Sequence, residues 1–313
     1  MKVAIVDLGT NTCRLYLAAV EPGGTIVTYS RLTTVVRLGQ GVDRTGYLHP
    51  DAVARTRACL SEYAPRLAAY GAARRLLIAT SVLRDAVDGG EFLAAVERDL
   101  DLPSRVLSGE EEGALAFRGG SAALTAAAAD PLLLVDIGGG STEFAIGAAG
   151  AQPGFVRSLD VGVVRLTERF FSQDPPPPGE VSALSAHVAA AIQGGVPATL
   201  RAAVGAAVGV AGTYTTLAAH KLGMRVYEPD RIQGHVLALA DIDAAIAEFV
   251  RLTNAARGRL AGIQPGREDV ILAGALIARE ACRAFGLGAV TCSEADLLQG
   301  AALALADGSL SAG

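Results

Sequence analysis

The stretch VAIVDLGTNTCRLYLAAV (residues 3–20) decides the fold, because a close variant of it, LLLVDIGGGSTEFAIGAA, returns at residues 132–149. In each copy an apolar run leads to an Asp, an apolar residue and a Gly, and small polar residues then precede a second apolar run. Apolar runs on both sides of a glycine-containing turn predict a β-hairpin. Asp7 and Asp136 are the matched positions, so the chain is expected to contain two similar halves.

Helical and extended patterns alternate around the two hairpins. A helix is expected from His49 to Tyr70, with Pro50 at its first position. The other strands are expected at 75–80, 105–107, 132–137, 143–147, 155–159 and 206–211, and the other helices at 91–100, 110–117, 163–171, 180–193, 213–222, 241–254, 268–285 and 294–305. The tract 121–130 would extend a helix or form the crossover into the second half. This alternation predicts an α/β fold.

Length, charge and cysteine content narrow the class of protein. The chain has 313 residues, which is long for one domain and suits two. Its net charge of −5 argues against a nucleic-acid or membrane-surface binder, although a local positive cleft for a polyanion remains compatible with it. The cysteines are scattered without a CxxC pair, which predicts small buried residues in a reducing cytosol: Cys13, Cys59, Cys282 and Cys292.

Neither a leader nor a membrane span is expected. Acidic Asp7 interrupts the first apolar run, so the N-terminus does not resemble a signal peptide, and we expect a cytoplasmic protein. Residues 202–219 carry no charge, but they are rich in Ala and Gly rather than Leu. A strand, a turn and a buried helix explain this run better than a membrane helix does.

The turn DIGGGST (136–142) has the composition of a phosphate-binding site. Three consecutive glycines leave the backbone N–H groups accessible to an anion, and the hydroxyl group of Ser141 adds a donor. Asp136 and Glu143 offer two carboxylates for a hard cation. The glycines concerned are Gly138, Gly139 and Gly140.

Two further turns have a similar character. In DLGTNT (7–12), Gly9 permits the bend and the next three residues supply donors; paired with the second copy, this turn could grip one phosphate chain from another side. GVAGT (209–213) is a third glycine turn, whose Gly212 and Thr213 amides would lie at a helix N-terminus. Neither hairpin turn is a P-loop or a dinucleotide fingerprint, since the required Lys-Ser/Thr and GxGxxG patterns are missing.

Acidic and basic side chains elsewhere have two interpretations. Three acids in SGEEEG (108–113) either favour the dipole of a helix that starts there or supply a carboxylate that positions and deprotonates water. Arg84, at the end of ATSVLR (79–84), is either a phosphate ligand or a surface charge.

Taken in order, these motifs resemble the exopolyphosphatase/guanosine pentaphosphate phosphohydrolase family of the actin, sugar kinase and Hsp70-like superfamily. The resemblance rests on VDLGTNT, ATSVLR, SGEEEG, VDIGGGSTEF, SLDVGVVRL (158–166), GVAGT and SEADLLQG (293–300). It implies two ribonuclease-H-like domains with a cleft between them. We expect the first domain at 1–124, joined by a last helix at 296–313, and the second at 125–295.

The resemblance also implies roles for individual residues. Glu112 matches the catalytic glutamate, with Glu111 as the alternative because an added acid blurs the match, and Asp136 and Glu143 match the metal-associated acids. The metal would be Mg²⁺, with Mn²⁺ as a substitute. The complete set of expected phosphate-binding residues is Asp7, Gly9, Thr10, Asn11, Arg84, Gly138, Gly139, Gly140, Ser141, Gly212 and Thr213.

The expected activity is release of the terminal phosphate from inorganic polyphosphate by a homodimer without nucleic-acid or membrane partners. Longer family members carry extra C-terminal helical domains that are absent from this sequence, so we expect a preference for short chains. The ending LLQG (297–300) departs from the usual L-R-E-G, so an arginine contact is lost. Hydrolysis of guanosine pentaphosphate, phosphate transfer to a sugar, and non-catalytic binding of an alarmone or polyphosphate stay open as alternatives.

Overall fold

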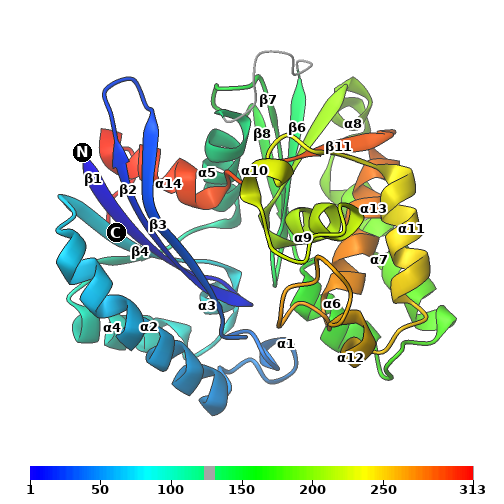
Figure 1. The fold of residues 1–313 in the computed structure, drawn as a ribbon, viewed down its shortest axis with the longest axis horizontal. Coiled ribbons are helices and arrows are strands. Elements are labelled where there is room, and N and C mark those ends of the chain that lie inside the picture. Colours follow the sequence, from blue (N-terminus) through cyan, green and yellow to red (C-terminus); the bar gives the residue numbers. More distant parts are fainter. Residues whose placement is uncertain (123–130, 313) are drawn as a thin grey trace. The chain divides into compact units, whose positions relative to one another are not determined.

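The computed structural model describes residues 1–122 and 131–312, which form two compact units (Figure 1). Unit 1 combines Met1–Gly119 with the C-terminal segment that begins at Leu297, and unit 2 runs from Gly120 to Asp296. Within the tract 121–130, helix α5 ends at Ala122, and residues 123–130 lie outside the described part of the chain. Whether the units are the independent domains expected at 1–124 and 125–295 stays a prediction.

Unit 1 is built on a five-stranded sheet with the order β3-β2-β1-β4-β5. Strands β1, β2 and β3 are antiparallel neighbours, whereas β1, β4 and β5 run parallel. The elements of unit 1 are β1 (Lys2–Leu8), β2 (Thr12–Val20), β3 (Ile26–Val35), α1 (Val42–Thr45), α2 (Pro50–Tyr70), β4 (Arg74–Ala79), α3 (Ser81–Asp85), α4 (Gly89–Leu100), β5 (Ser104–Val106), α5 (Gly109–Ala122, whose last turn belongs to unit 2) and α14 (Leu297–Asp307).

Unit 2 repeats this order with one strand added at an edge, β10-β11-β9-β6-β7-β8. Strands β6, β7 and β8 are antiparallel neighbours, and β6, β9 and β11 run parallel. The elements of unit 2 are β6 (Leu132–Ile137), β7 (Thr142–Gly147), β8 (Phe155–Leu159), α6 (Val163–Phe170), α7 (Pro178–Gly195), α8 (Ala198–Ala203), β9 (Ala206–Val210), α9 (Ala211–Lys221), α10 (Pro229–Ile232), β10 (Val236–Ala238), α11 (Leu239–Phe249), α12 (Asn254–Arg257), α13 (Ile271–Ala284) and β11 (Ala289–Cys292).

Both sheets therefore have the strand order and directions of the ribonuclease-H fold. The hairpins expected at 3–20 and 132–149 are β1–β2 and β6–β7, and each is the centre of its sheet. The predicted α/β class with two ribonuclease-H-like halves is confirmed. The expected cleft depends on how the halves are placed and stays a prediction.

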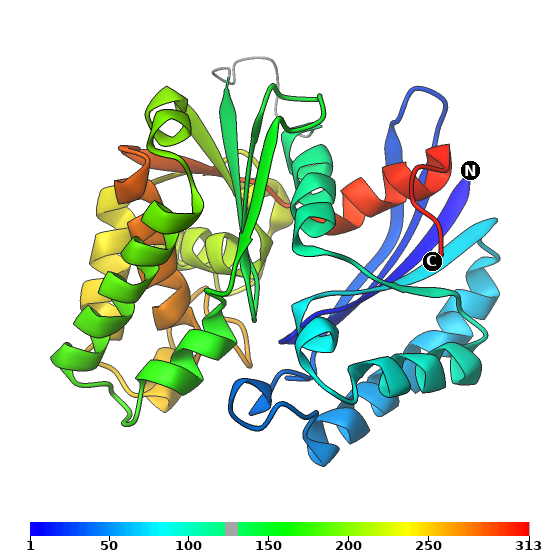
Figure 2. The ribbon, with the colours of Figure 1, turned by 180° about the vertical axis from the view of Figure 1, so that it is seen from behind.

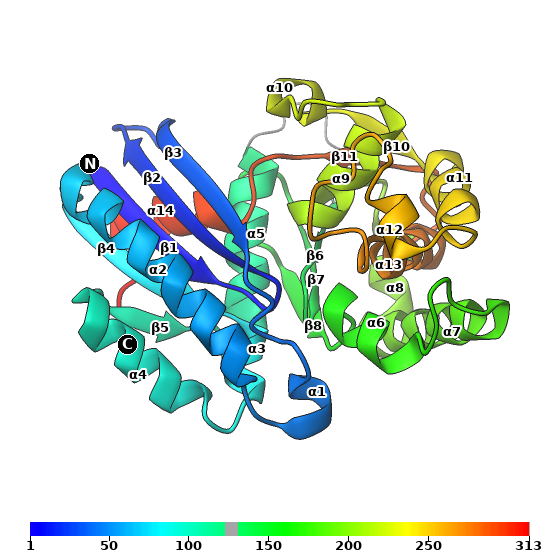
Figure 3. The same ribbon diagram turned by 60° about the horizontal axis from the view of Figure 1, so that its bottom comes forward.

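The central strands are buried on both faces, which explains their nearly continuous apolar sequences. In unit 1, α2 and α4 cover one face of the sheet and α14 covers the other (Figures 2 and 3). Gly300 lets α14 cross α5 closely, because a Cβ atom there would lie 1.8 Å from the carbonyl oxygen of Leu115. Leu298, where the family pattern has Arg, is fully buried, so an apolar core residue replaces that expected contact.

Several elements differ from the sequence-based expectations. Strands β3, β10 and β11 were not predicted, because β3 is rich in polar residues and the other two are only three and four residues long. The helix expected at 241–254 ends at Phe249, since Thr253 caps the separate helix α12 by accepting a hydrogen bond from the N–H group of Ala256. The helix expected at 294–305 begins only at Leu297.

The uncharged run at 202–219 forms β9 and α9, as expected. Within residues 1–122 and 131–312, no helix combines the length and apolar character needed to cross a membrane. The four cysteines are buried and free, which confirms their predicted role as small core residues. Burial raises the pKa of Cys282 to about 11 and that of Cys292 to about 12, so both thiols stay protonated at neutral pH.

Candidate active site

The first hairpin turn in unit 1 is tied to neighbouring elements by its own polar groups. The N–H group of Gly9 donates to the carbonyl oxygen of Thr12 at 2.9 Å, which closes the turn. The hydroxyl groups of Thr10 and Ser81 share a hydrogen bond of 3.0 Å, so the turn lies beside the start of α3. The carbonyl oxygen of Asn11 accepts from the N–H groups of the segment that follows β3. Thr10 and Asn11 are thereby held in fixed positions.

Helix α3 also carries Arg84, which contacts Glu112 of α5. One guanidinium nitrogen, Nη1, donates to the carbonyl oxygen of Leu107 at 2.6 Å and lies 3.3 Å from Oε2 of Glu112. The side chain of Glu112 is 9% exposed. Arg84 is therefore engaged with the candidate catalytic carboxylate, a contact that the sequence did not predict. This arrangement favours a positioning role for Arg84 beside the expected phosphate contact.

Glu111 has a different set of partners. Its carboxylate accepts a hydrogen bond from the N–H group of Ser108 at 2.8 Å, and Ser108 Oγ accepts from the N–H group of Glu111 at 3.1 Å. This reciprocal pair is a capping box for α5. Arg105 also forms an ion pair with the Glu111 carboxylate. Glu111 is therefore used at the helix terminus, and Glu112 is the acid that geometry favours for chemistry.

The triple-glycine turn in unit 2 rests on the N-terminus of α6. The carbonyl oxygens of Gly138 and Gly139 accept hydrogen bonds from the N–H groups of Val163 and Val164 at 3.0 and 2.8 Å. The carbonyl oxygen of Gly140 accepts from Nε of Arg165 at 2.9 Å. The N–H group of Gly138 donates to the carbonyl oxygen of Ser141 at 3.0 Å, so the N–H groups of Gly139 and Gly140 and the hydroxyl group of Ser141 are the parts of the turn suited to contact an anion.

Asp136 and Glu143 lie directly opposite each other in the β6–β7 ladder. Residues paired in this way point to the same face of a sheet. Asp136 is 6% exposed and Glu143 is 0% exposed. The hydroxyl group of Ser158 donates to Oε1 of Glu143 at 2.6 Å, which orients that carboxylate. Two facing, buried carboxylates repel each other unless a cation or a proton lies between them.

This pair fits a divalent cation of the Mg²⁺ type. Within residues 1–122 and 131–312, no group of three or more His, Cys, Asp or Glu is arranged to hold a metal. Mg²⁺ does not need such a cage, because it usually binds one or two carboxylates together with substrate phosphates and water. Asp136 and Glu143 provide two such carboxylates, and the adjacent triple-glycine turn is suited to hold the phosphate.

The third glycine turn lies next to this pair. Strands β6 and β9 are parallel, with Asp136 in register with Val210, so the turn follows the carboxyl end of the neighbouring strand. Gly212 lies in the first turn of α9 and leaves room for Arg267, because a Cβ atom would lie 1.6 Å from its Nη1. The guanidinium group therefore lies at the helix N-terminus, beside Gly212 and Thr213, and adds positive charge to a site suited to anions.

A sequence model of the Ppx/GppA phosphatase family matches residues 17–307. The chain belongs to this family. Exopolyphosphatase 2 of Mycobacterium tuberculosis is 39% identical over 97% of this chain and 98% of its own length. Among solved structures, an exopolyphosphatase-like protein has a TM-score of 0.91 and 32% identity, covering 99% of this chain and 100% of its own. The Aquifex aeolicus family member has a TM-score of 0.82 and 29% identity, covering 99% of both chains.

Membership in the Ppx/GppA family confirms the family predicted from the ordered motifs and the prediction of a phosphate-hydrolysing enzyme. Unit 1 brings together Gly9, Thr10 and α3, and α3 carries Arg84 to Glu112. Unit 2 brings together the triple-glycine turn, its two carboxylates and the third glycine turn. The expectation that turns 7–12 and 136–143 grip the same phosphate chain stays a prediction.

Sequence reasoning missed two arginines of these Ppx/GppA sites. Arg14 lies opposite Asp7 in the β1–β2 ladder, and its Nε and Nη2 atoms are both 2.7 Å from Oδ2 of Asp7. The seven-residue spacing from Asp7 to Arg14 equals that from Asp136 to Glu143, so the hairpin register alone predicts this pair. Arg267 had no comparable signal, because its loop reaches Gly212 only through the tertiary fold.

Proposed function

We propose that this chain is an exopolyphosphatase, which releases the terminal phosphate of inorganic polyphosphate by metal-assisted hydrolysis. The observation that carries the proposal is the pair of facing carboxylates, Asp136 and Glu143, beside the triple-glycine turn. The name of the Mycobacterium tuberculosis relative, Exopolyphosphatase 2, supports the same activity. The sheet-centre turns of both units supply donors for phosphate oxygens.

In the proposed mechanism the turns bind and orient the substrate. N–H groups around Gly9, Gly139 and Gly212, with the hydroxyl groups of Thr10 and Ser141, donate hydrogen bonds to phosphate oxygens. Asp136 and Glu143 would hold Mg²⁺, which would neutralise phosphate charge. These contacts leave the terminal phosphorus open to attack in line with the bridging oxygen.

Glu112 serves as the general base. Its carboxylate accepts a proton from a water molecule whose oxygen attacks the terminal phosphorus. The bond from that phosphorus to the bridging oxygen breaks, which yields orthophosphate and a chain shortened by one phosphate. Arg84, 3.3 Å from Oε2 of Glu112, holds this carboxylate in place. Because Arg84 also donates to the carbonyl oxygen of Leu107, its position is fixed by the fold.

Substitution of Glu112 tests the mechanism, with its neighbour Glu111 as the matched control. We expect Glu112→Gln to lower kcat by about a thousandfold or more with little change in KM, because it removes the base and keeps the shape. Glu111→Gln should keep activity within about tenfold and lower stability by less than about 1 kcal/mol, because Gln also forms a capping box and only the ion pair with Arg105 is lost. Phosphate release under turnover conditions and thermal unfolding measure both effects. Release at the wild-type rate by Glu112→Gln would reject the assignment.

Finer properties belong to the same proposal. We propose Mg²⁺ as the metal with Mn²⁺ as a substitute, a homodimer in the cytoplasm, and a preference for short chains. Phosphate release with each metal, after chelation and readdition, tests the first point, and sedimentation tests the second. Guanosine pentaphosphate is the second substrate to assay, since the family is named for both activities.

A further inference from the structure

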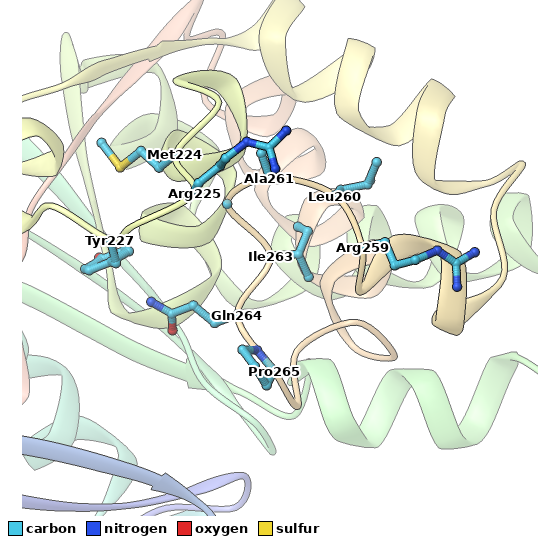
Figure 4. Close-up of a pocket in the computed structure, with 10 residues that line it drawn as sticks. Met224, Arg225, Tyr227, Arg259, Leu260, Ala261, Ile263, Gln264 and Pro265 are labelled. Atoms are coloured by element: carbon cyan, nitrogen blue, oxygen red, sulfur yellow. The ribbon is translucent and has the colours of Figure 1, made fainter.

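A pocket of about 330 Å³ opens in unit 2 at the C-terminal end of α9. Its walls come from two segments, Met224, Arg225 and Tyr227 after α9, and the loop of residues 259–265 that precedes α13 (Figure 4). The pocket contains none of the residues assigned above to phosphate binding, metal binding or proton transfer.

The loop is fixed on the end of α9 by specific contacts. The N–H group of Gly262 donates to the carbonyl oxygen of Met224 at 2.7 Å, and Nδ1 of His220 donates to the carbonyl oxygen of Ala261 at 2.9 Å. Gly262 has a φ angle of +83°, and a Cβ atom there would lie 2.2 Å from the backbone nitrogen of His220. These hydrogen bonds hold the two walls in fixed positions, so the pocket does not depend on a mobile loop.

The polar lining of this pocket is positively charged. Arg225 and Arg259 come from different walls, and the described residues that line the pocket include no Asp or Glu. Neither guanidinium group has a hydrogen-bond or ion-pair partner among the described residues. Two other exposed arginines of unit 2 do have carboxylate partners: Arg231 pairs with Glu228, and Arg283 pairs with Asp243. Two guanidinium groups without a carboxylate partner in one concave site are suited to bind an anion with several oxygens.

The pocket adjoins the third glycine turn. Gln264 lines the pocket, and its Oε1 atom accepts a hydrogen bond from Nε of Arg267 at 3.2 Å. The guanidinium group of Arg267 lies against Gly212. One side chain thus separates the pocket from a turn proposed to bind phosphate.

We propose that Arg225 and Arg259 bind phosphate groups of polyphosphate that lie beyond the terminal group, as a distal subsite. This proposal rests on the proposed exopolyphosphatase function. Chains long enough to reach from Gly212 into the pocket gain these contacts, whereas the shortest substrates do not. Within the proposed preference for short chains, the two arginines would therefore decide how strongly the enzyme favours chains that reach the pocket over tripolyphosphate, which does not.

The test compares an Arg225→Ala/Arg259→Ala double variant with Arg251→Ala, which removes an exposed arginine of unit 2 outside the pocket. Steady-state phosphate release is measured with tripolyphosphate, long-chain polyphosphate and guanosine pentaphosphate. We expect the double variant to raise KM for long-chain polyphosphate about tenfold or more, with kcat unchanged. KM for tripolyphosphate should change less than about twofold. Arg251→Ala should change neither value.

Three results would overturn the distal subsite. They are an unchanged KM for long chains, an equal rise for both chain lengths, and an equal rise in Arg251→Ala. A loss confined to guanosine pentaphosphate would also overturn it and would assign the pocket to a nucleotide. Conservative Arg225→Lys/Arg259→Lys substitution should restore part of the affinity, because it returns the charge without the planar fork.

A binding measurement separates this proposal from the proposed function. Calorimetric titration of long-chain polyphosphate in metal-free buffer reports affinity without turnover. If the wild-type protein releases no phosphate from any polyphosphate, the proposed function fails; weaker binding by the double variant alone would still support the subsite. Equal binding by wild type and double variant would reject the subsite, whatever the activity.

Discussion

The β1–β2 hairpin of unit 1 and the β6–β7 hairpin of unit 2 have the same backbone arrangement but carry different charges. Each closes on a glycine turn and places its motif aspartate opposite the residue seven positions later. In unit 1 that residue is Arg14, which neutralises Asp7. In unit 2 it is Glu143, which adds a second negative charge beside Asp136.

This difference suggests how two copies of one fold can serve two functions, phosphate binding without a metal ion and phosphate binding with one. In the first hairpin Arg14 neutralises Asp7, so in the proposed function its turn would donate to a phosphate without a bound metal ion. The second hairpin places two like charges directly opposite each other, an arrangement that weakens a strand pair. In the proposed function a divalent cation would bind both carboxylates, which would tie folding of the second hairpin to the proposed chemistry.

The largest expected effect follows from removing one carboxylate of the second hairpin. We expect Asp136→Asn to lower phosphate release by about a thousandfold, equivalent to ~4 kcal/mol, because metal binding is weakened. Added Mg²⁺ should raise Tm of the wild type and not of Asp136→Asn, as followed by calorimetry. Arg14→Gln, in the other hairpin, should keep the Mg²⁺-dependent rise. A full rise in Asp136→Asn would contradict the metal assignment.

A medium effect is expected from the charge pair of the first hairpin. Arg14→Gln should lower the free energy of unfolding by about 3 kcal/mol, because it leaves the buried Asp7 carboxylate without its guanidinium partner. Urea unfolding in metal-free buffer measures the loss.

The matching change in the second hairpin should have the opposite sign. In metal-free buffer, Glu143→Gln should stabilise the chain by up to about 1 kcal/mol, since it relieves repulsion with Asp136. Urea midpoints of the two variants can be compared directly. Equal destabilisation by both would show that the hairpins do not differ in the proposed way.

The smallest effect is expected from Asp307, the last residue of α14, whose carboxylate pairs with Arg118 of α5. Burial raises the pKa of Asp307, but hydrogen bonds from Ser309 and Arg118 outweigh it and lower the pKa to about 2. A lowered folded-state pKa gives stability that is complete above the unfolded pKa near 4 and is lost as pH falls toward 2. Because Asp307 is 48% exposed, we expect Asp307→Asn to cost only about 0.5 kcal/mol at neutral pH. The difference between the unfolding midpoints of variant and wild type should shrink below about pH 4.

The sequence predicted what depends on local pattern. The similarity of residues 3–20 and 132–149 predicted both hairpins, and hence the centre of each sheet. Apolar runs on both sides of a glycine turn are typical of a β-hairpin. The edge strands β3 and β10 were missed, because edge positions tolerate polar or very short segments. Arg267 and the distal pocket depend on a loop reaching back to α9, a contact that no local pattern encodes.

Among the acidic residues, sequence left Glu111 and Glu112 as alternatives. They are adjacent in a helix, so they point in different directions, and only the partners of each side chain separate them. The capping box formed by Glu111 with Ser108 follows the sequence pattern S-x-x-E and could have been recognised. The contact between Arg84 and Glu112 could not have been recognised from the sequence, because it joins two separate helices, α3 and α5.

Because α14 covers one face of the unit 1 sheet, translation order matters for this protein. A nascent chain can complete unit 2 while the first-made strands still lack their covering helix, which reverses the usual N-terminal-first order. Until residues 297–307 have been synthesised, β1 and β4 lack the helix that covers this apolar face of the sheet. A stalled or truncated product would keep that surface open, so loss of the C-terminal segment should mark the chain for degradation.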